Sequence, residues 1–163
     1  MKRLTLILLL STVFFAAKAT QQVNDEVIIN GQTWELISSP MEYLQPETAD
    51  AFKALIGERD FINTSNYRGY IAYWYVDRGR LYLDRVEVPQ KNGESRILYF
   101  KDLKKVFRRY RCWGKIKAGW LTGNITAGHG IGQPDPSAPY KPAFAEEEYW
   151  VLKKGKIIQT TTK

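Results

Sequence analysis

Cysteine and histidine are almost absent from the 163-residue chain, which has one of each, Cys112 and His129. A single cysteine excludes an internal disulfide framework, and the two residues together are too few for a zinc site built from cysteine and histidine. A Ser-His-Asp relay also needs a histidine with an orienting partner, and the sequence shows none. The sequence therefore predicts no metal site and no cofactor, offers no catalytic residue, and favours a protein that is not an enzyme.

Acidic residues are also few, at 17 Asp+Glu against 24 Lys+Arg, a net charge of +7. Part of this excess lies at the N-terminus, where MKR precedes an apolar run at 4–17 and the small-x-small pattern AKA at 17–19. This order of features is typical of a cleaved secretory signal peptide. We therefore predict a signal peptide at 1–19 and a single domain at 20–163, which begins with a polar leader at 20–25.

Cleavage would remove three basic residues and no acidic one, leaving a net charge of +4. The remainder has no other apolar run of the roughly 20 residues that span a bilayer, so we expect no transmembrane segment. The expected location is a bacterial periplasm or the exterior. Export argues against a nucleic-acid partner, as does the lack of a nucleic-acid-binding motif. In this oxidising space Cys112, next to Tyr110 and Trp113, is expected to be a buried, inert thiol.

Short runs of β-branched and aromatic residues separated by turn residues predict a series of β-hairpins. Asn30-Gly31 supplies the positive φ angles of a type I′ turn, and a last hairpin is predicted around Lys154-Gly155. In the clearest stretch, 68–88, two strands flank a tight turn at 77–80. The first of these strands is apolar or amphipathic on both faces, which predicts a central strand covered on both sides.

Two short helices are predicted, at 47–56 and 100–110, the first capped by Glu47 or Thr48 and ended by Gly57. Residues 113–127 are predicted to form one long or bent strand. Residues 128–144 hold four prolines and three glycines and are predicted to be an exposed, flexible loop. The expected fold class is α+β, with a mainly antiparallel sheet of hairpins, curved or partly closed, and two short helices.

The second helix provides the candidate binding surface. An apolar stripe of Phe100, Leu103, Phe107 and Tyr110 leaves five basic residues on its other faces: Lys101, Lys104, Lys105, Arg108 and Arg109. Three tyrosines of the central hairpin are expected to face outward beside them, Tyr73, Tyr75 and Tyr82, whereas Trp74 and Trp120 are expected in the core. The expected partner is a protein or an anionic component of the envelope. A solvated helix face without a partner is the alternative.

A hydrolase acting on envelope polymers is the competing function. Such an enzyme needs two carboxylates at a defined spacing, and the candidates are Asp77, Asp84, Glu87 and the run at 146–148. His129 lies between glycines in the predicted loop, without an orienting partner.

The run RGYIAYWYVDRGRLYL at 68–83 resembles the hairpin signature RGYIA-x-W-E-I-x-D-G-x-LYL of a family of uncharacterised bacterial proteins. INGQTWEL at 29–36 is similar to the first hairpin of that family, and AGWLTG at 118–123 to one of its strands. The chain departs from the signature at Tyr75, where the family has an acidic residue. The resemblance implies a small β-rich fold and no activity. Members resemble accessory proteins found beside toxin systems, which makes a toxin-neutralising, immunity-like role a further alternative.

Overall fold

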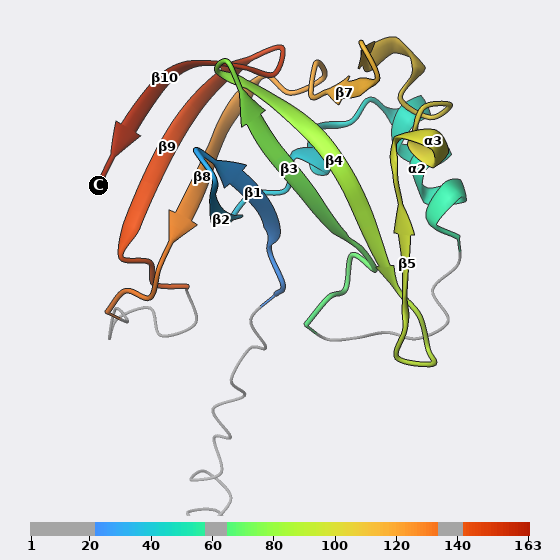
Figure 1. Ribbon diagram of the computed structural model, residues 1–163, viewed down its shortest axis with the longest axis horizontal. Helices are drawn as coiled ribbons and strands as arrows, with labels where there is room; N and C mark the ends of the chain where they lie inside the picture. The colour runs from blue at the N-terminus through green and yellow to red at the C-terminus, as the bar shows by residue number, and fades with distance from the viewer. Residues whose placement is uncertain (1–21, 58–64, 134–141) are drawn as a thin grey trace, which may run out of the picture.

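The computed structural model of the protein describes residues 22–57, 65–133 and 142–163, so the predicted signal peptide lies outside the described residues. Strands are the main secondary structure of the described residues, and the two α-helices, at 46–56 and 100–103, lie at one end (Figure 1). The elements in chain order are β1 (Asp25–Ile29), β2 (Gln32–Leu36), the 3-10 helix η1 (Pro40–Tyr43), α2 (Pro46–Ile56), β3 (Ile71–Asp77), β4 (Arg80–Pro89), β5 (Ser95–Leu98), α3 (Phe100–Leu103), the 3-10 helix η2 (Arg108–Tyr110), β6 (Arg111–Cys112), β7 (Lys115–Lys117), β8 (Gly123–His129), β9 (Glu146–Lys153) and β10 (Lys156–Thr162).

The strands form one sheet that closes on itself. Neighbouring strands follow the order β10-β9-β8-β2-β1-β3-β4, and β10 pairs with β4 at Lys156 and Arg80 to complete a ring of seven strands. β5, β7 and β6 extend the sheet from β4. The prediction of an α+β fold with a curved or closed sheet is confirmed. The sheet is mixed rather than purely antiparallel, because β1 and β3 run parallel.

Four two-residue turns join antiparallel strands, and each has positive φ at both positions. Their φ angles are 50° and 82° at Asn30-Gly31, 50° and 67° at Arg78-Gly79, 48° and 73° at Trp113-Gly114, and 49° and 71° at Lys154-Gly155. Positive φ at both central residues is the requirement of a type I′ turn, whose twist matches that of the strands. Three of these hairpins are predicted correctly from the sequence.

The stretch that was predicted as one strand, 113–127, begins with the turn at Trp113-Gly114 and is divided further along the chain. β7 ends at Lys117, and the chain turns at 118–121, where the amide of Leu121 donates to the carbonyl of Ala118 at 2.9 Å. β8 then begins at Gly123. The prediction of a single strand is wrong. The turn at 118–121 places both Ala118 and Leu121 in the core, where their backbones bond to Leu81 and Gly155 as the sheet closes.

The closure depends on Gly155, in the turn between β9 and β10. Its amide donates to the carbonyl of Leu121 at 2.8 Å, and its carbonyl accepts from the amide of Leu81 at 2.9 Å. A Cβ added to Gly155 would lie 2.6 Å from the carbonyl oxygen of Ala118. Only glycine combines the positive φ with this close approach of backbones. The turn at Gly155 is therefore held in place by the backbones of Leu81, Ala118 and Leu121.

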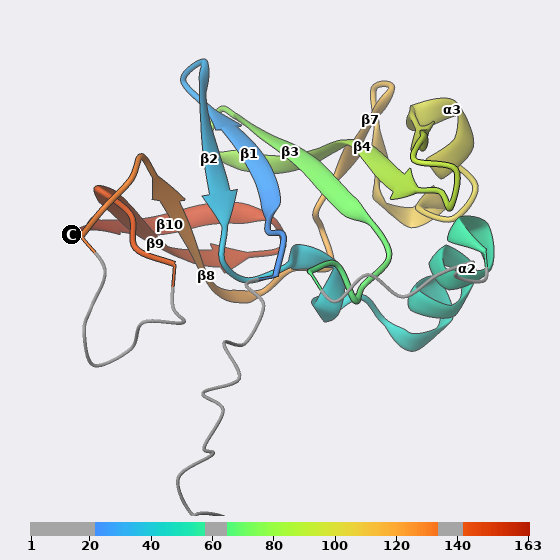
Figure 2. The same cartoon turned by 90° about the horizontal axis from the view of Figure 1, so that it is seen from below.

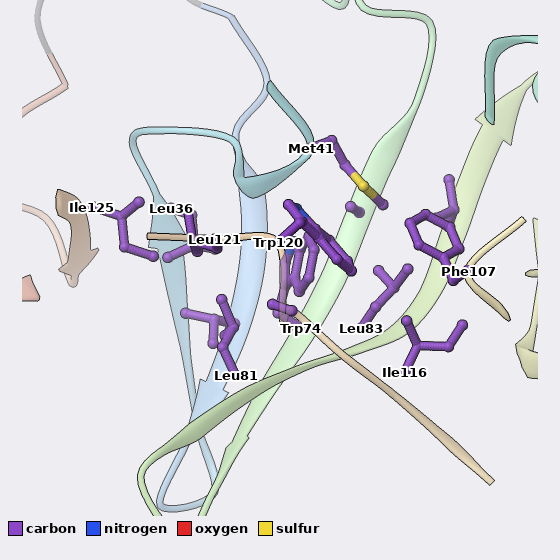
Figure 3. Packing of buried hydrophobic residues seen from close by; sticks show 14 of the residues in the cluster. Leu36, Met41, Trp74, Leu81, Leu83, Phe107, Ile116, Trp120, Leu121 and Ile125 are labelled. Carbon is purple, nitrogen blue, oxygen red and sulfur yellow. The ribbon is translucent and has the colours of Figure 1, made fainter. Parts of the chain in front are cut away.

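Large apolar side chains fill the interior of the closed sheet (Figure 3). Trp74 and Trp120 lie in this core as predicted, with 1% and 8% of their surface exposed, and their ring centroids are 6.1 Å apart. The indole of Trp120 donates to the carbonyl of Pro40 at 2.9 Å and contacts the ring of Phe107 at a centroid distance of 5.2 Å. Trp120 thus connects the sheet to the helical end, where α2 and α3 lie close together (Figure 2).

The first helix agrees with its prediction and the second does not. α2 ends at Gly57, which has φ 83°, although its N-cap is Gln45 followed by Pro46, and no side chain makes the expected cap hydrogen bond. The helix predicted at 100–110 is one short turn, α3, followed by turns at 104–107 and the 3-10 helix η2. The chain leaves helical geometry at Phe107 (φ −92°, ψ 31°), because Phe107 and Tyr110 must both pack on Trp120.

The predicted leader at 20–25 ends in a buried residue. Asp25 begins β1 and is fully buried, where it accepts hydrogen bonds from the hydroxyl of Ser39 at 2.7 Å and the amide of Ala72 at 3.1 Å. The guanidinium of Arg68 lies 3.2 Å from the same carboxylate. Burial raises the pKa of Asp25, and the attraction of Arg68 opposes this shift. The leader prediction is wrong at Asp25, because these partners satisfy a buried carboxylate.

The predicted loop at 128–144 is partly a strand. β8 continues through His129, and beyond it the amide of Gly132 donates to Ala143 and that of Ala145 to His129, both at 3.0 Å. The ring of Phe144 occupies the space that a side chain on Gly128 would need, so this glycine serves packing rather than flexibility. Residues 134–141 of the predicted loop lie outside the described residues.

Candidate binding surface

The outer face of β3 carries the predicted tyrosines. β3 lies between β1 and β4, as a central strand should, but Tyr73 and Tyr75 on its outer face are half-exposed, so the expected cover on both sides is absent in the described residues. Tyr75 pairs with Tyr82 on β4, and their rings stack at a centroid distance of 5.3 Å and an interplanar angle of 16°. The prediction that these tyrosines face outward is confirmed.

Lys115 joins this tyrosine pair to the basic part of the chain. Its ammonium lies 5.5 Å from the ring centre of Tyr75 and 5.3 Å from that of Tyr82, within the range of a cation–π interaction. The same ammonium donates to the carboxylate of Asp77 at 3.0 Å, and this hydrogen bond raises the pKa of Lys115. Tyr75 and Tyr82 therefore adjoin the basic segment through β7.

Tyr73 belongs to a different group of side chains. Its hydroxyl donates to the carboxylate of Glu87 at 2.8 Å, and the guanidinium of Arg85 lies 3.8 Å from its ring centre. Burial, followed by the hydrogen bond to Glu87, raises the pKa of Tyr73 to about 12. On its other side Tyr73 pairs with Glu26 of β1. Of the three predicted tyrosines, Tyr73 alone has carboxylates rather than a lysine beside it.

All five basic residues predicted for the surface are exposed, although they lie on α3, on the turns at 104–107 and on η2 rather than on one helix. The structure adds three basic residues that the prediction missed, Arg111, Lys115 and Lys117, because the expected helix ended at Tyr110. Between 101 and 117 the only acidic residue is Asp102, which is half-buried and accepts a hydrogen bond from the amide of Tyr99 at 3.0 Å. The segment therefore presents an excess of positive charge.

Few of these positive charges are neutralised within the protein. Lys115 pairs with Asp77, and Arg109 lies 4.0 Å from Glu47, with both of the latter side chains largely in solvent. An ion pair between two exposed side chains contributes little. Across the ranges 22–57, 65–133 and 142–163, the other six basic residues of the segment have no carboxylate within 4.0 Å: Lys101, Lys104, Lys105, Arg108, Arg111 and Lys117.

Trp113 lies at the tip of the hairpin formed by β6 and β7, with 97% of its surface exposed. The sequence predicts the opposite, because Trp113 is one of the apolar neighbours expected to bury Cys112. Cys112 is half-buried, and the tryptophan projects from the turn instead. The prediction is wrong because Trp113-Gly114 is the turn itself, and no later segment covers it in the described chain.

The tip of this hairpin and α3 lie beside each other at one end of the molecule in both views (Figures 1 and 2). A hollow of about 290 Å³ separates η2 from α2 and is lined by Lys105, Arg108 and Arg109 together with Glu47. We call the exposed side chains of this end, together with the half-buried Lys117, the basic surface: Lys101, Lys104, Lys105, Arg108, Arg109, Arg111, Trp113, Lys115 and Lys117.

Two of the candidate groups for enzymatic chemistry, His129 and Glu146, face each other in the register of β8 and β9. His129 is on β8, where its ring stacks on Trp34 at 5.1 Å and its Nδ1 lies 2.8 Å from the carbonyl oxygen of Thr33. Its predicted place in a flexible loop is therefore wrong. The described residues contain no group of three or more His, Cys, Asp or Glu side chains that could hold a metal ion.

Five of the six candidate carboxylates for hydrolysis accept a hydrogen bond from another side chain. Asp77 accepts from Lys115, Asp84 from Arg85 at 2.8 Å, and Glu87 from Tyr73 and the hydroxyl of Ser95. In the predicted run at 146–148, Glu147 accepts from the hydroxyl of Tyr149 and Glu148 from the indole of Trp150. These bonds explain the residues as parts of the sheet surface.

One pair of carboxylates that was not predicted lies directly across β1 and β2. Glu26 faces Glu35 in the register and lines a hollow of about 310 Å³ with it. Burial raises the pKa of Glu26, and the proximity of Glu35 adds to this shift. Among the described residues, the hollow is lined by β1, β2 and the segment before them, through Gln22, Val23, Asn24, Glu26 and Glu35. This arrangement does not enclose a polymer between two carboxylates.

Comparisons with family models, with curated proteins and with solved structures give no match to the chain. The family resemblance of the 68–83 hairpin stays a prediction. Among the described residues, no helix has the length and apolar character needed to cross a membrane.

Proposed function

We propose that the protein is an exported binding domain without enzymatic activity, which holds an anionic partner of the bacterial envelope on its basic surface. The observation that carries this proposal is the set of six basic side chains, five of them exposed and one half-buried, without a carboxylate partner in the described ranges. Like charges gathered on one surface repel each other and oppose the compact state. An anionic partner would relieve this repulsion. A surface with only a structural role would be destabilised by the repulsion without any compensating benefit.

The support beneath these charges is rigid. Leu103 and Phe107 are fully buried, and Tyr110 contacts the ring of Trp120 at a centroid distance of 4.9 Å. The basic side chains therefore project from a segment that is anchored in the core at every turn. A binding surface on such a support loses less entropy on association than a flexible tail does.

The location follows from the predicted signal peptide at 1–19, and the periplasm or the exterior is the proposed compartment. The partner is then an envelope component or an exported protein with negative charge. A nucleic acid, the partner that net charge alone would suggest, does not belong to this compartment.

Reversal of charge on the basic surface tests the proposal. The triple variant Lys104→Glu, Lys105→Glu, Arg108→Glu and wild type are sedimented with an isolated cell-envelope preparation from a Gram-negative bacterium at low salt. We expect wild type to sediment and the variant to lose binding by at least about tenfold, because each basic residue near an anionic surface contributes about 1 kcal/mol. Raising the salt should release wild type through screening.

A control of equal charge change is available on other parts of the surface. Lys91, Lys153 and Lys163 are exposed and lie outside the basic surface, so their reversal to Glu lowers the net charge by the same amount. This control should bind within about twofold of wild type if position rather than total charge matters. Equal loss in the two triple variants, or full binding by both, would overturn the proposed function.

A further inference from the structure

Trp113 combines two unfavourable properties. Its φ of 48° lies in the left-handed region, which bulky side chains rarely adopt, and 97% of its surface is exposed. The other three turns of this type have Asn30, Arg78 and Lys154 at the same position, all polar residues. No ring or cation contact of Trp113 occurs within the described residues. Strain and exposure held without internal compensation indicate a role outside the fold.

The surroundings of Trp113 indicate what it contacts. Arg111 and Lys115 on either side of the turn are exposed, and the rest of the basic surface adjoins the hairpin. A tryptophan ring among lysines and arginines is the combination that binds the interface of a bilayer, with the ring among the headgroups and the cations on the phosphates. Anionic lipid supplies the negative charge that the basic surface lacks.

A lipid surface fits this arrangement better than a protein does. Tryptophans that dominate protein interfaces sit at the centre of an apolar contact area that excludes water. Trp113 instead lies alone at the tip of a narrow two-residue turn, with charged side chains around it. A protruding ring surrounded by cations matches a partner that is anionic at its surface and apolar just beneath.

We propose that the protein docks on anionic phospholipid bilayers, with the ring of Trp113 inserted among the headgroups and the basic surface lying on the phosphates. This inference rests on the proposed function, because it names the partner of the same basic surface. Attachment is peripheral and reversible, since a single ring and exposed charges give a salt-sensitive contact.

Binding to vesicles of defined composition tests this inference. Wild type should bind vesicles of phosphatidylglycerol and phosphatidylethanolamine, and should bind phosphatidylcholine vesicles at least about tenfold more weakly. Trp113→Asn should lower binding to the anionic vesicles by about tenfold while leaving the fold intact, because Asn-Gly is the preferred pair for this turn. Ile131→Asn is the matched control, since Ile131 is 96% exposed outside the basic surface and its loss should change binding less than about twofold.

Tryptophan fluorescence gives a second readout. The other four tryptophans, Trp34, Trp74, Trp120 and Trp150, expose 8% of their surface or less. Quenching by phosphatidylglycerol with brominated acyl chains therefore reports mainly on Trp113, and should vanish in Trp113→Asn.

The outcomes separate this inference from the proposed function. Wild type that ignores anionic vesicles, Trp113→Asn that binds like wild type, or bromolipid that leaves emission unchanged each overturns the lipid assignment. If wild type still sediments with envelopes in a manner sensitive to charge reversal, the proposed function stands and the partner is an anionic protein or polymer.

Discussion

The turns Trp113-Gly114 and Lys154-Gly155 have the same backbone and opposite surroundings. Their φ angles are 48° and 73° in the first turn and 49° and 71° in the second. Gly155 is buried and hydrogen-bonded on both sides of the closure, whereas a Cβ on Gly114 would have no heavy atom within 4 Å. The same local conformation therefore forms a buried contact of the closed sheet at Lys154-Gly155 and an exposed hairpin tip at Trp113-Gly114.

The comparison also reverses what hydropathy suggests. The turn with a lysine lies against the core through its glycine, and the turn with a tryptophan projects into solvent. What distinguishes them is the chain that lies across each turn. Residues 118–121 and β4 cover the second turn, and no described segment covers the first.

Replacing the glycine of each turn by alanine should cause the largest change in the free energy of unfolding. Gly155→Ala adds steric overlap with the backbone of Ala118 to the strain of positive φ, and should lower the free energy of unfolding by about 3 kcal/mol or more. Gly114→Ala carries the strain alone, so its loss should be about 1 kcal/mol. Urea unfolding followed by tryptophan fluorescence measures both.

The order of these two values matters more than their size. Equal losses would show that Gly155 does not hold the closure of the sheet. A larger loss for Gly114→Ala would mean that the hairpin of β6 and β7 is packed against another part of the chain.

Asparagine at the first position of each turn should produce a smaller effect of opposite sign. Trp113→Asn and Lys154→Asn both replace a residue that disfavours positive φ by one that tolerates it, so each should raise the free energy of unfolding by about 0.5–1 kcal/mol. Thermal unfolding of both variants beside wild type checks this. If Trp113→Asn were instead destabilised while Lys154→Asn gained stability, Trp113 would be packing within the protein, and its assignment to a lipid surface would fail.

Removal of the Lys115 side chain should have the smallest effect. The positive charge of Lys115 lowers the pKa of Tyr75, which burial raises, so Lys115→Ala should move the pKa of Tyr75 further up. The expected change in stability is minor, because the ion pair with Asp77 is about half exposed on both sides. An NMR titration of the Tyr75 ring measures the shift.

Lys117→Ala serves as the control for this titration. Lys117 faces Tyr82 in the register and does not contribute to the shift of Tyr75. A pKa of Tyr75 that falls in Lys115→Ala, or that rises equally in the two variants, would contradict the contact between Lys115 and the tyrosine pair.

Much of the local structure could be predicted from the sequence, because turn chemistry acts between neighbours in the chain. Asn30-Gly31 and Lys154-Gly155 mark hairpins by their residue types alone, and the alternation around Trp74 marks its inner face. The parallel pairing of β1 with β3 was not predicted, since it joins segments separated by α2. No pattern in either strand specifies its partner.

The candidate site was predicted only in part, because some of its features depend on local sequence and others on the pairing of distant strands. The exposure of Lys104 and Arg108 follows from an apolar stripe that packs on Trp120, even though the helix itself breaks. Lys115 was missed because its neighbours Tyr75 and Tyr82 are brought to it only by the pairing of β4 with β7. The split between Tyr73 and the other two tyrosines depends on the carboxylates of β1 and β4, which also lie far away in sequence.

The sequence by itself determined three of the four hairpin turns, the first helix, the burial of Trp74 and Trp120, and the concentration of positive charge between 101 and 109. These features depend on side-chain chemistry and on spacing along the chain. Only the tertiary structure decided that the sheet closes at Gly155, that His129 lies within a strand, and that Trp113 projects into solvent. Burial of a residue depends on which distant segment packs over it. In a closed sheet this packing is decided only when the first and last strands of the ring pair.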